Sequence, residues 1–237
     1  YYGSICNDLG LSVVSNSNGK VFVTGIVDDN NPCDYLSTYS LPIIPSSNQV
    51  VDNENDDTPE AFIFAVDPYI NGNATISYSS YFGGGGAEGP GTYLCEHAIS
   101  LAVDNEDYIY MAGLTNSSTN SFYYLDPIIP FPQNNDPSLY VKDDIQNFNN
   151  PLRYDSYIAS FSPQMELVWT TYFGGFQLDK TTSISIRPDQ KLMFVGLTFS
   201  KNEYANGEPE LELVDYDGAI STSAYYQDHT GPYYPAW

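Results

Sequence analysis

The sequence predicts an all-β fold: a β-propeller segment of three consecutive four-stranded antiparallel blades, part of a larger or incomplete propeller with long insertions on one face. Two sets of segments recur in a fixed order. VFVTG at 21–25 returns as IYMAG at 109–113 and LMFVG at 192–196, and SYSSYFGG at 77–84 returns as VWTTYFGG at 168–175. No stretch shows helical periodicity, and 16 Pro with 18 Gly disfavour helices.

Each repeat contains four short apolar or alternating segments, which predict four antiparallel strands. These segments cover 9–15, 20–26, 61–67 and 74–82, then 98–103, 108–114, 156–162 and 167–173, and finally 183–187, 192–198, 210–215 and 219–226. The blades of this single segment therefore span about 5–82, 95–173 and 178–226, followed by a tail over 227–237. The third strand of the last repeat matches least well.

Glycine recurs at equivalent points of the repeats. Gly25, Gly113 and Gly196 stand late in the second strand, where the missing side chain is expected to permit close approach of one sheet to another. Gly83 and Gly174 end the fourth strand, where a positive φ is expected to help the chain turn sharply.

Long connections join the second to the third strand, over about 27–60 and 115–155, and the first blade to the second, over 83–96. In an antiparallel blade these connections emerge on one face, and the short turns emerge on the other. Any partner is expected on the insertion face, because loops on a rigid scaffold commonly carry binding. Five tyrosines are candidate anchors, although their rings could instead pin the loops to the blades: Tyr35, Tyr39, Tyr123, Tyr124 and Tyr140.

The repeats resemble the bacterial SBBP-type β-propeller repeat. The resemblance rests on AFIFAVDP, SYFGG and LAVDNEDYIYMAGLT, and again on SYIASFSP, TYFGG and SISIRPDQKLMFVGLT. It departs where Glu106 and Asp107 replace the usual Gly-Asn. The resemblance implies a large exported surface protein, frequent in the Bacteroidetes with type IX secretion, and it supplies no catalytic residues.

The amino-acid composition disfavours several classes of partner. A net charge of −23, from 30 acidic and 7 basic residues, disfavours nucleic acid and anionic membranes as partners. No apolar run of about 18 residues exists, so no membrane insertion is expected. We expect a non-enzymatic secreted or cell-surface scaffold for display, adhesion or assembly, with a protein or glycan partner. The alternatives are a glycan-binding module of a surface complex and a hydrolase at the channel mouth, where Glu96 and His97 would be tested.

Several carboxylates are candidate ligands for Ca²⁺, and the sequence does not assign the site to one of them. Asp8, Glu96 and Asp179 align at the start of the first strand of each repeat, and Asp215 and Asp217 form a further candidate pair. Such oxygens suit Ca²⁺ or a cationic ligand. The alternative is that each carboxylate accepts backbone N–H bonds and stabilises a turn.

Three cysteines are present, so at least one is unpaired. Cys6 begins the first strand and Cys33 follows the second strand of the same blade, which predicts a disulfide between them and a free thiol at Cys95. The opening YYGS resembles the end of a YFGG strand. We therefore expect the intact protein to continue in at least one direction, so that the remainder of its own longer chain is also a partner.

Overall fold

The computed structural model describes residues 7–28, 43–44, 60–70, 73–83, 97–115, 154–174 and 178–199. Within these ranges the chain forms ten β-strands and no helix, which confirms the all-β class. Every strand pairs with its neighbours in antiparallel fashion.

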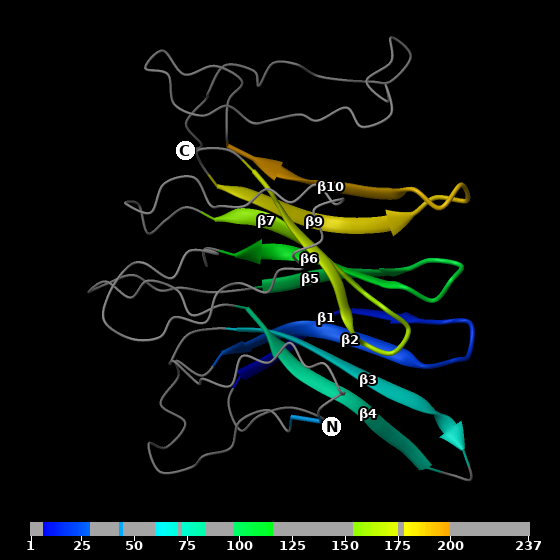
Figure 1. Cartoon of the computed structure of the whole chain (residues 1–237). Helices are drawn as coiled ribbons and strands as arrows, with labels where there is room; N and C mark the ends of the chain where they lie inside the picture. Colours follow the sequence, from blue (N-terminus) through cyan, green and yellow to red (C-terminus); the bar gives the residue numbers. More distant parts are fainter. Residues whose placement is uncertain are drawn as a thin grey trace, which may run out of the picture.

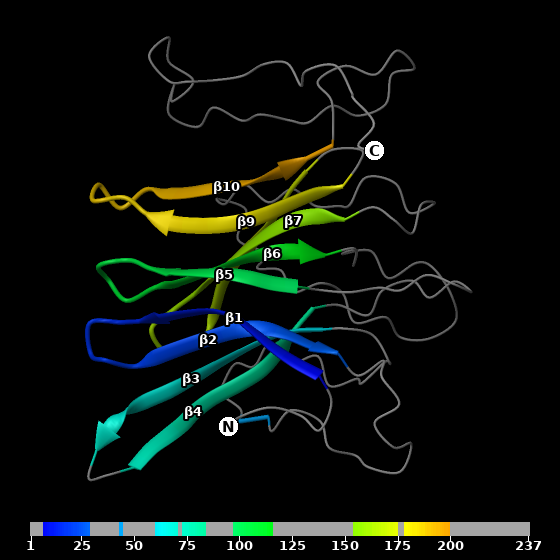
Figure 2. The same cartoon turned by 180° about the vertical axis from the view of Figure 1, so that it is seen from behind.

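The strands form three sheets in the order of the sequence (Figure 1). The first sheet contains β1 (Asn7–Ser15), β2 (Val21–Asp28), β3 (Glu60–Ile70) and β4 (Asn73–Phe82). The second contains β5 (His97–Val103), β6 (Ile109–Thr115), β7 (Asp155–Phe161) and β8 (Leu167–Phe173). The third contains β9 (Asp179–Ile186) and β10 (Leu192–Thr198). Figure 2 shows that β1, β5 and β9, the leading strands, lie on one side of the stack.

The predicted strands are found with small shifts in their ends. The fourth strand of the second repeat and the second strand of the third repeat have the expected bounds, whereas β9 begins at Asp179, ahead of the expected 183. The strands expected over 210–215 and 219–226 lie outside the described residues. The described sheets form an open stack and do not close into a ring.

Apolar side chains fill both junctions between sheets. Phe82 of the first sheet contacts Tyr157 and Phe161 of the second, with ring centroids 5.4 and 5.7 Å apart, and these rings belong to the largest buried cluster. At the next junction Ile184 packs with Ala112 and other side chains of the second sheet. Burial of this apolar surface is the main force that stacks the sheets.

The glycines of the second strands do not permit the close approach between sheets that the sequence predicts; they permit a close contact within one sheet. Each leading strand has an irregularity in its pairing, and the glycine lies opposite it. A Cβ at Gly25, Gly113 or Gly196 would overlap the carbonyl oxygen of Leu9, His97 or Lys180. The close neighbour is therefore the backbone of the adjacent strand in the same sheet, not a second sheet. A β-bulge brings that carbonyl inward, and only glycine leaves room for it.

Candidate functional site

Four short turns share one backbone geometry. They are Asn16 to Lys20, Asp104 to Tyr108, Ser162 to Glu166 and Arg187 to Lys191. In each, the first N–H donates to the carbonyl of the fifth residue, and the fourth N–H donates to the carbonyl of the first. The fourth residue has positive φ: Gly19, Asp107, Met165 and Gln190, between 64° and 79°. This is the hairpin connection in which a type I turn precedes a left-handed residue.

The first side chain of three of these turns closes the loop locally. Asp104 Oδ1 accepts hydrogen bonds from the N–H groups of Glu106 and Tyr108, both at 2.9 Å. Asn16 Oδ1 and Ser162 Oγ make the equivalent pairs of contacts. The Asp104 carboxylate therefore has a structural role, because it stabilises the turn in which it lies.

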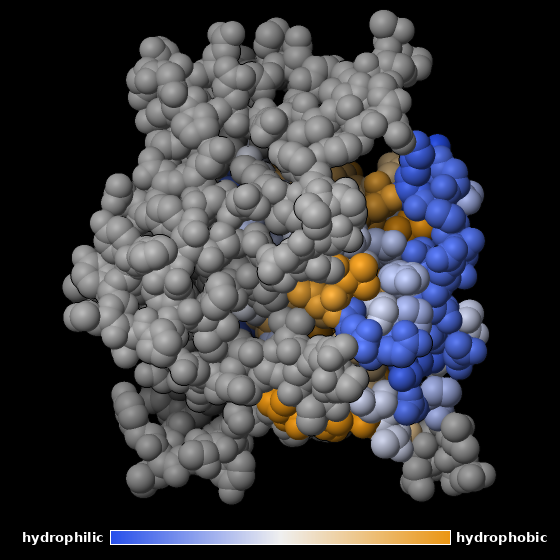
Figure 3. All heavy atoms as spheres, viewed as in Figure 1, coloured by the Kyte–Doolittle hydropathy of each residue, from blue (hydrophilic) through white to orange (hydrophobic). Residues whose placement is uncertain are grey.

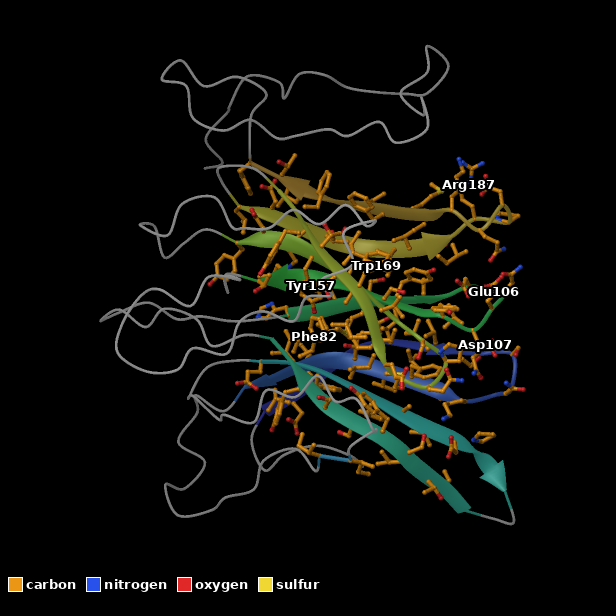
Figure 4. All side chains as sticks on the ribbon, in the orientation of Figure 1. Phe82, Glu106, Asp107, Tyr157, Trp169 and Arg187 are labelled. Carbon is orange, nitrogen blue, oxygen red and sulfur yellow. The ribbon has the colours of Figure 1, made fainter. Side chains whose placement is uncertain are left out.

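Neighbouring turns are also joined to one another. Asp107 accepts bonds from the Ser17 N–H at 2.9 Å, the Ser17 hydroxyl at 2.7 Å and the Asn18 amide at 3.3 Å. The bonds from the backbone and hydroxyl of Ser17 lower the pKa of Asp107. On the other side, the Asn105 N–H donates to Gln190 Oε1 at 3.0 Å. Figure 4 shows Glu106 and Asp107 at this end of the stack, with Arg187 beyond them.

A tyrosine ties the same end to the junction between the second and third sheets. The Tyr110 hydroxyl donates to Asp104 Oδ2 at 2.9 Å, and the ring lies 6.1 Å from that of Trp169. Burial, assisted by this bond and by the charge of Asp104, raises the pKa of Tyr110 to about 12. Figure 3 shows hydrophilic residues gathered over the turns, so this end is a polar and cross-braced surface.

The leading strands carry a second repeated contact. The Leu101 N–H on β5 donates to Ser12 Oγ on β1 at 3.0 Å. One sheet further, the Ile184 N–H on β9 donates to Ser100 Oγ on β5 at 3.1 Å. The side chains of Leu101 and Ile184 are 4% and 5% exposed. Each is buried against the sheet that precedes its own, next to the hydrogen bond made by its N–H. The same register repeats at both junctions, and Ser183 is the third serine in the series.

That register also tests the alignment of the candidate carboxylates. It places Asp8 of β1 and Asp179 of β9 at equivalent positions, as the sequence predicts, while Glu96 lies outside the described residues. Asp179 is buried, and its N–H donates to the Tyr154 carbonyl at 2.7 Å. Burial, with a smaller effect of the Lys180 charge, lowers the pKa of His97. Among the described residues no group of three or more His, Cys, Asp or Glu side chains converges on a metal position.

Gly174 departs from expectation. It follows β8, and its φ is not positive. A Cβ there would overlap the Asp155 carboxylate and would lie 3.0 Å from Asp179 Oδ2. Glycine is needed at this point because two buried carboxylates occupy the space of a side chain, not because the chain turns through a left-handed conformation.

Several predicted site residues lie outside the described part of the chain. They are the five candidate tyrosines, Tyr35, Tyr39, Tyr123, Tyr124 and Tyr140, the cysteines Cys6, Cys33 and Cys95, and the carboxylates Glu96, Asp215 and Asp217. Sequence reasoning missed Ser12, Ser100 and Asp107. The signal for the serines was present, since LSVV, ISLA and TSIS place serine at one position of the three repeats once the bulges are aligned.

Comparison of the sequence with models of protein families finds no match, and comparison with curated proteins finds none. The part of the chain that the structure describes contains no helix that is long and apolar enough to cross a membrane. Fold and site together define an all-β protein of stacked antiparallel sheets, held in register by leading-strand serines and by bonds between turns.

Proposed function

We propose that the chain is a non-enzymatic propeller scaffold of an exported cell-surface protein, in which each sheet is one blade. The observation that carries this proposal is the repeated contact of the leading strands. Ser12 with Leu101 and Ser100 with Ile184 relate successive sheets in the same way, as neighbouring blades require. The repeat motifs that resemble SBBP-type proteins belong to the same proposal and suggest the exported location.

The distribution of connections supports a role in display, adhesion or assembly. The tight turns at one end are braced against one another through Asp107 and Gln190. The opposite ends of the strands lead into the long connections, such as the one that leaves at Thr115 and returns at Asp155. A rigid base with long loops on the other face suits binding of a protein partner, and the candidate tyrosines lie in those loops.

The test replaces residues 117–153 with a two-residue Asn-Gly turn between β6 and β7, and it keeps Tyr154, whose carbonyl accepts the Asp179 N–H. Thr115 pairs with Asp155 at the end of this ladder, so a tight hairpin fits the strand register. We expect the wild-type chain to bind a member of a panel of immobilised extracellular matrix proteins. The shortened variant should keep its melting temperature and lose that binding. Asn105→Asp, at the turn end, is the matched control and should bind normally.

Two other functions, glycan binding and hydrolysis, would replace the scaffold function if the same experiments gave different results. Binding to an oligosaccharide on a glycan array, with no protein bound, would make the chain a glycan-binding module. Release of a product from a polysaccharide or peptide, abolished by His97→Gln, would make it a hydrolase. Retention of protein binding by the shortened variant would contradict the assignment of the insertion face.

A further inference from the structure

The insertion between β2 and β3 returns to its own sheet at one point. Ile44 in this insertion forms an isolated antiparallel bridge with Ser79 of β4, the last strand of the first sheet. The Ile44 N–H donates to the Ser79 carbonyl, and the Ser79 N–H donates to the Ile44 carbonyl, both at 3.1 Å. The neighbouring Ile43 packs against a buried cluster that includes Tyr81 of β4. The insertion therefore adds a short piece of strand to the outer edge of its sheet.

The sequence around this bridge suits a short contact at a sheet edge. The bridge lies within YSLPIIP, residues 39–45. Pro42 and Pro45 have no N–H group to donate to a ladder, and proline in sheets is confined to edges, strand starts and bulges. Proline also disfavours helical backbone in the residue before it, which favours an extended Ile44. Two β-branched apolar residues between two prolines thus make a strand that ends after one bridge.

The insertion between β6 and β7 contains the same motif. YLDPIIP at 124–130 repeats YSLPIIP at 39–45, with the tyrosine, both prolines and both isoleucines in the same places. Each motif stands in the connection between the second and third strands of its sheet. A motif repeated at one place in the topology, in loops of different length, indicates a contact common to both sheets. Residues 124–130 lie outside the part of the chain that the structure describes.

The outer edge of β8 is equivalent to the edge of β4 that Ile44 occupies. Thr170 pairs with Ala159 as Ser79 pairs with Phe64, and the irregularity before each pair falls at the same position of its strand. The Thr170 N–H and carbonyl therefore point to the outer edge, as those of Ser79 do. β8 is the last strand of its sheet, and none of the described segments pairs with that edge. Such an edge is a template for adding a strand.

We propose that the outer edge of β8 binds the second motif, residues 124–130, through Ile129. The Ile129 N–H donates to the Thr170 carbonyl, and the Thr170 N–H donates to the Ile129 carbonyl. This is the exchange of bonds that Ile44 and Ser79 make in the first sheet. The proposal rests on the scaffold function and adds the way in which its two long insertions are attached.

The side chains around Thr170 are consistent with the same contact. Thr170 is 1% exposed although it lies on the last strand of its sheet, and Ser79 is 0% exposed. Tyr172, which corresponds to Tyr81 in the aligned fourth strands, is also buried. Ile128 takes the place of Ile43 and packs at Tyr172. Apolar contact beside the bridge then favours attachment more than two backbone bonds alone do.

Attachment has two consequences for a scaffold that displays its loops. The fourth strands would no longer present unpaired edges, which otherwise invite pairing with other chains. Two of the candidate anchors, Tyr39 and Tyr124, are the first residues of the two motifs. Each therefore leaves its blade from a fixed point at the same place, which lowers the entropy cost of ordering it on a partner.

The experiment measures amide hydrogen exchange of the full chain by NMR at Ser79 and Thr170. Both N–H groups should exchange slowly in the wild-type chain. Ile129→Pro removes the N–H that donates to the Thr170 carbonyl and breaks the bridge. Exchange at Thr170 should then accelerate by about tenfold, as expected for one lost hydrogen bond, while Ser79 stays slow. Ile44→Pro should do the reverse, with fast exchange at Ser79 and slow exchange at Thr170.

Two controls separate loss of the bridge from the general effect of a new proline. Asn134→Pro places proline in the same insertion but outside the motif, and it should leave exchange at both positions unchanged. Ile129→Val keeps the N–H and a β-branched apolar side chain, so it should behave as the wild type does. Circular dichroism confirms that all variants are folded.

Three results would overturn the proposal: fast exchange at Thr170 in the wild type, slow exchange that Ile129→Pro does not change, or equal acceleration by Asn134→Pro. The second result would show that another segment or another molecule covers the edge of β8. If the Leu101 and Ile184 N–H groups still exchange slowly, these results leave the scaffold intact and remove only the attachment. Fast exchange at Leu101 and Ile184 would instead contradict the scaffold itself.

Discussion

The Asp107 carboxylate accepts hydrogen bonds from both the backbone N–H and the hydroxyl of Ser17, which lies 90 residues earlier in the chain. The two residues occupy neighbouring turns of different sheets. Asp107 adopts a left-handed conformation, with φ of 65°, where the first sheet has Gly19. A non-glycine residue in this conformation is uncommon, and aspartate tolerates it better than most. The strain of the turn is offset by the bonds that join it to the next one.

Replacing Asp107 should therefore give a stability change that depends on pH. The pKa of Asp107 is lowered in the folded state, so its contribution is present above the ordinary aspartate value of 3.8. It is lost as the pH falls below 3.8 through the lowered folded value. Asp107→Asn should be less stable than wild type at neutral pH, with the difference shrinking in acid. Urea unfolding at a series of pH values measures it. Glu106→Gln is the matched control, and an equal profile for both variants would contradict the Ser17 contact.

The leading-strand serines should contribute equally at the two junctions. Ser12→Ala and Ser100→Ala each leave a buried N–H, of Leu101 or Ile184, without its acceptor, which costs about 1–3 kcal/mol. Ser183→Ala removes an exposed hydroxyl and should change the free energy of unfolding by less than about 0.5 kcal/mol. Urea unfolding measures all three. Equal values for the three variants would show that the register does not stabilise the stack.

The second-strand glycines should be intolerant of even one methyl group. In Gly113→Ala the new Cβ overlaps the His97 carbonyl oxygen, and relief requires the bulge or the strand to move. We expect a loss of about 1–3 kcal/mol, typical of overpacking. Gly10→Ala is the control, on β1 opposite Gly25, where the nearest atom to a new Cβ is Val23 Cγ1 at 4.0 Å. A thermal melt that ranks Gly10→Ala as the worse change would refute this account of the bulge.

His97 should make the protein less stable in mild acid. Its pKa is lowered in the folded state because the ring is buried and Lys180 lies near it. Below the ordinary histidine value of 6.5 the unfolded chain binds a proton that the folded chain resists, so stability falls until the pH reaches the lowered value. His97→Gln should flatten the profile of unfolding free energy over this interval. If the substitution leaves the profile unchanged, a group other than His97 causes the loss of stability in mild acid.

The sequence was sufficient to predict strands and their order, because apolar alternation and repetition act locally along the chain. Ten strands and the short turns agree with it. Sequence reasoning placed the glycines correctly but assigned their contacts incorrectly. The bulge between Gly10 and Ser12, and the acid pair Asp155 and Asp179 around Gly174, depend on which backbone and side-chain atoms the fold brings together. The bond from Ser17 to Asp107 joins distant turns and has no local signal.

The most direct test of the stacked-blade scaffold is residue-resolved amide hydrogen exchange by NMR at Leu101 and Ile184. If Ser12 and Ser100 set the register, both N–H groups exchange slowly in the wild-type chain. Ser12→Ala then accelerates exchange mainly at Leu101, and Ser100→Ala mainly at Ile184. Fast exchange at both positions in the wild type, or slow exchange that neither substitution changes, would contradict the repeated contact on which the scaffold is built.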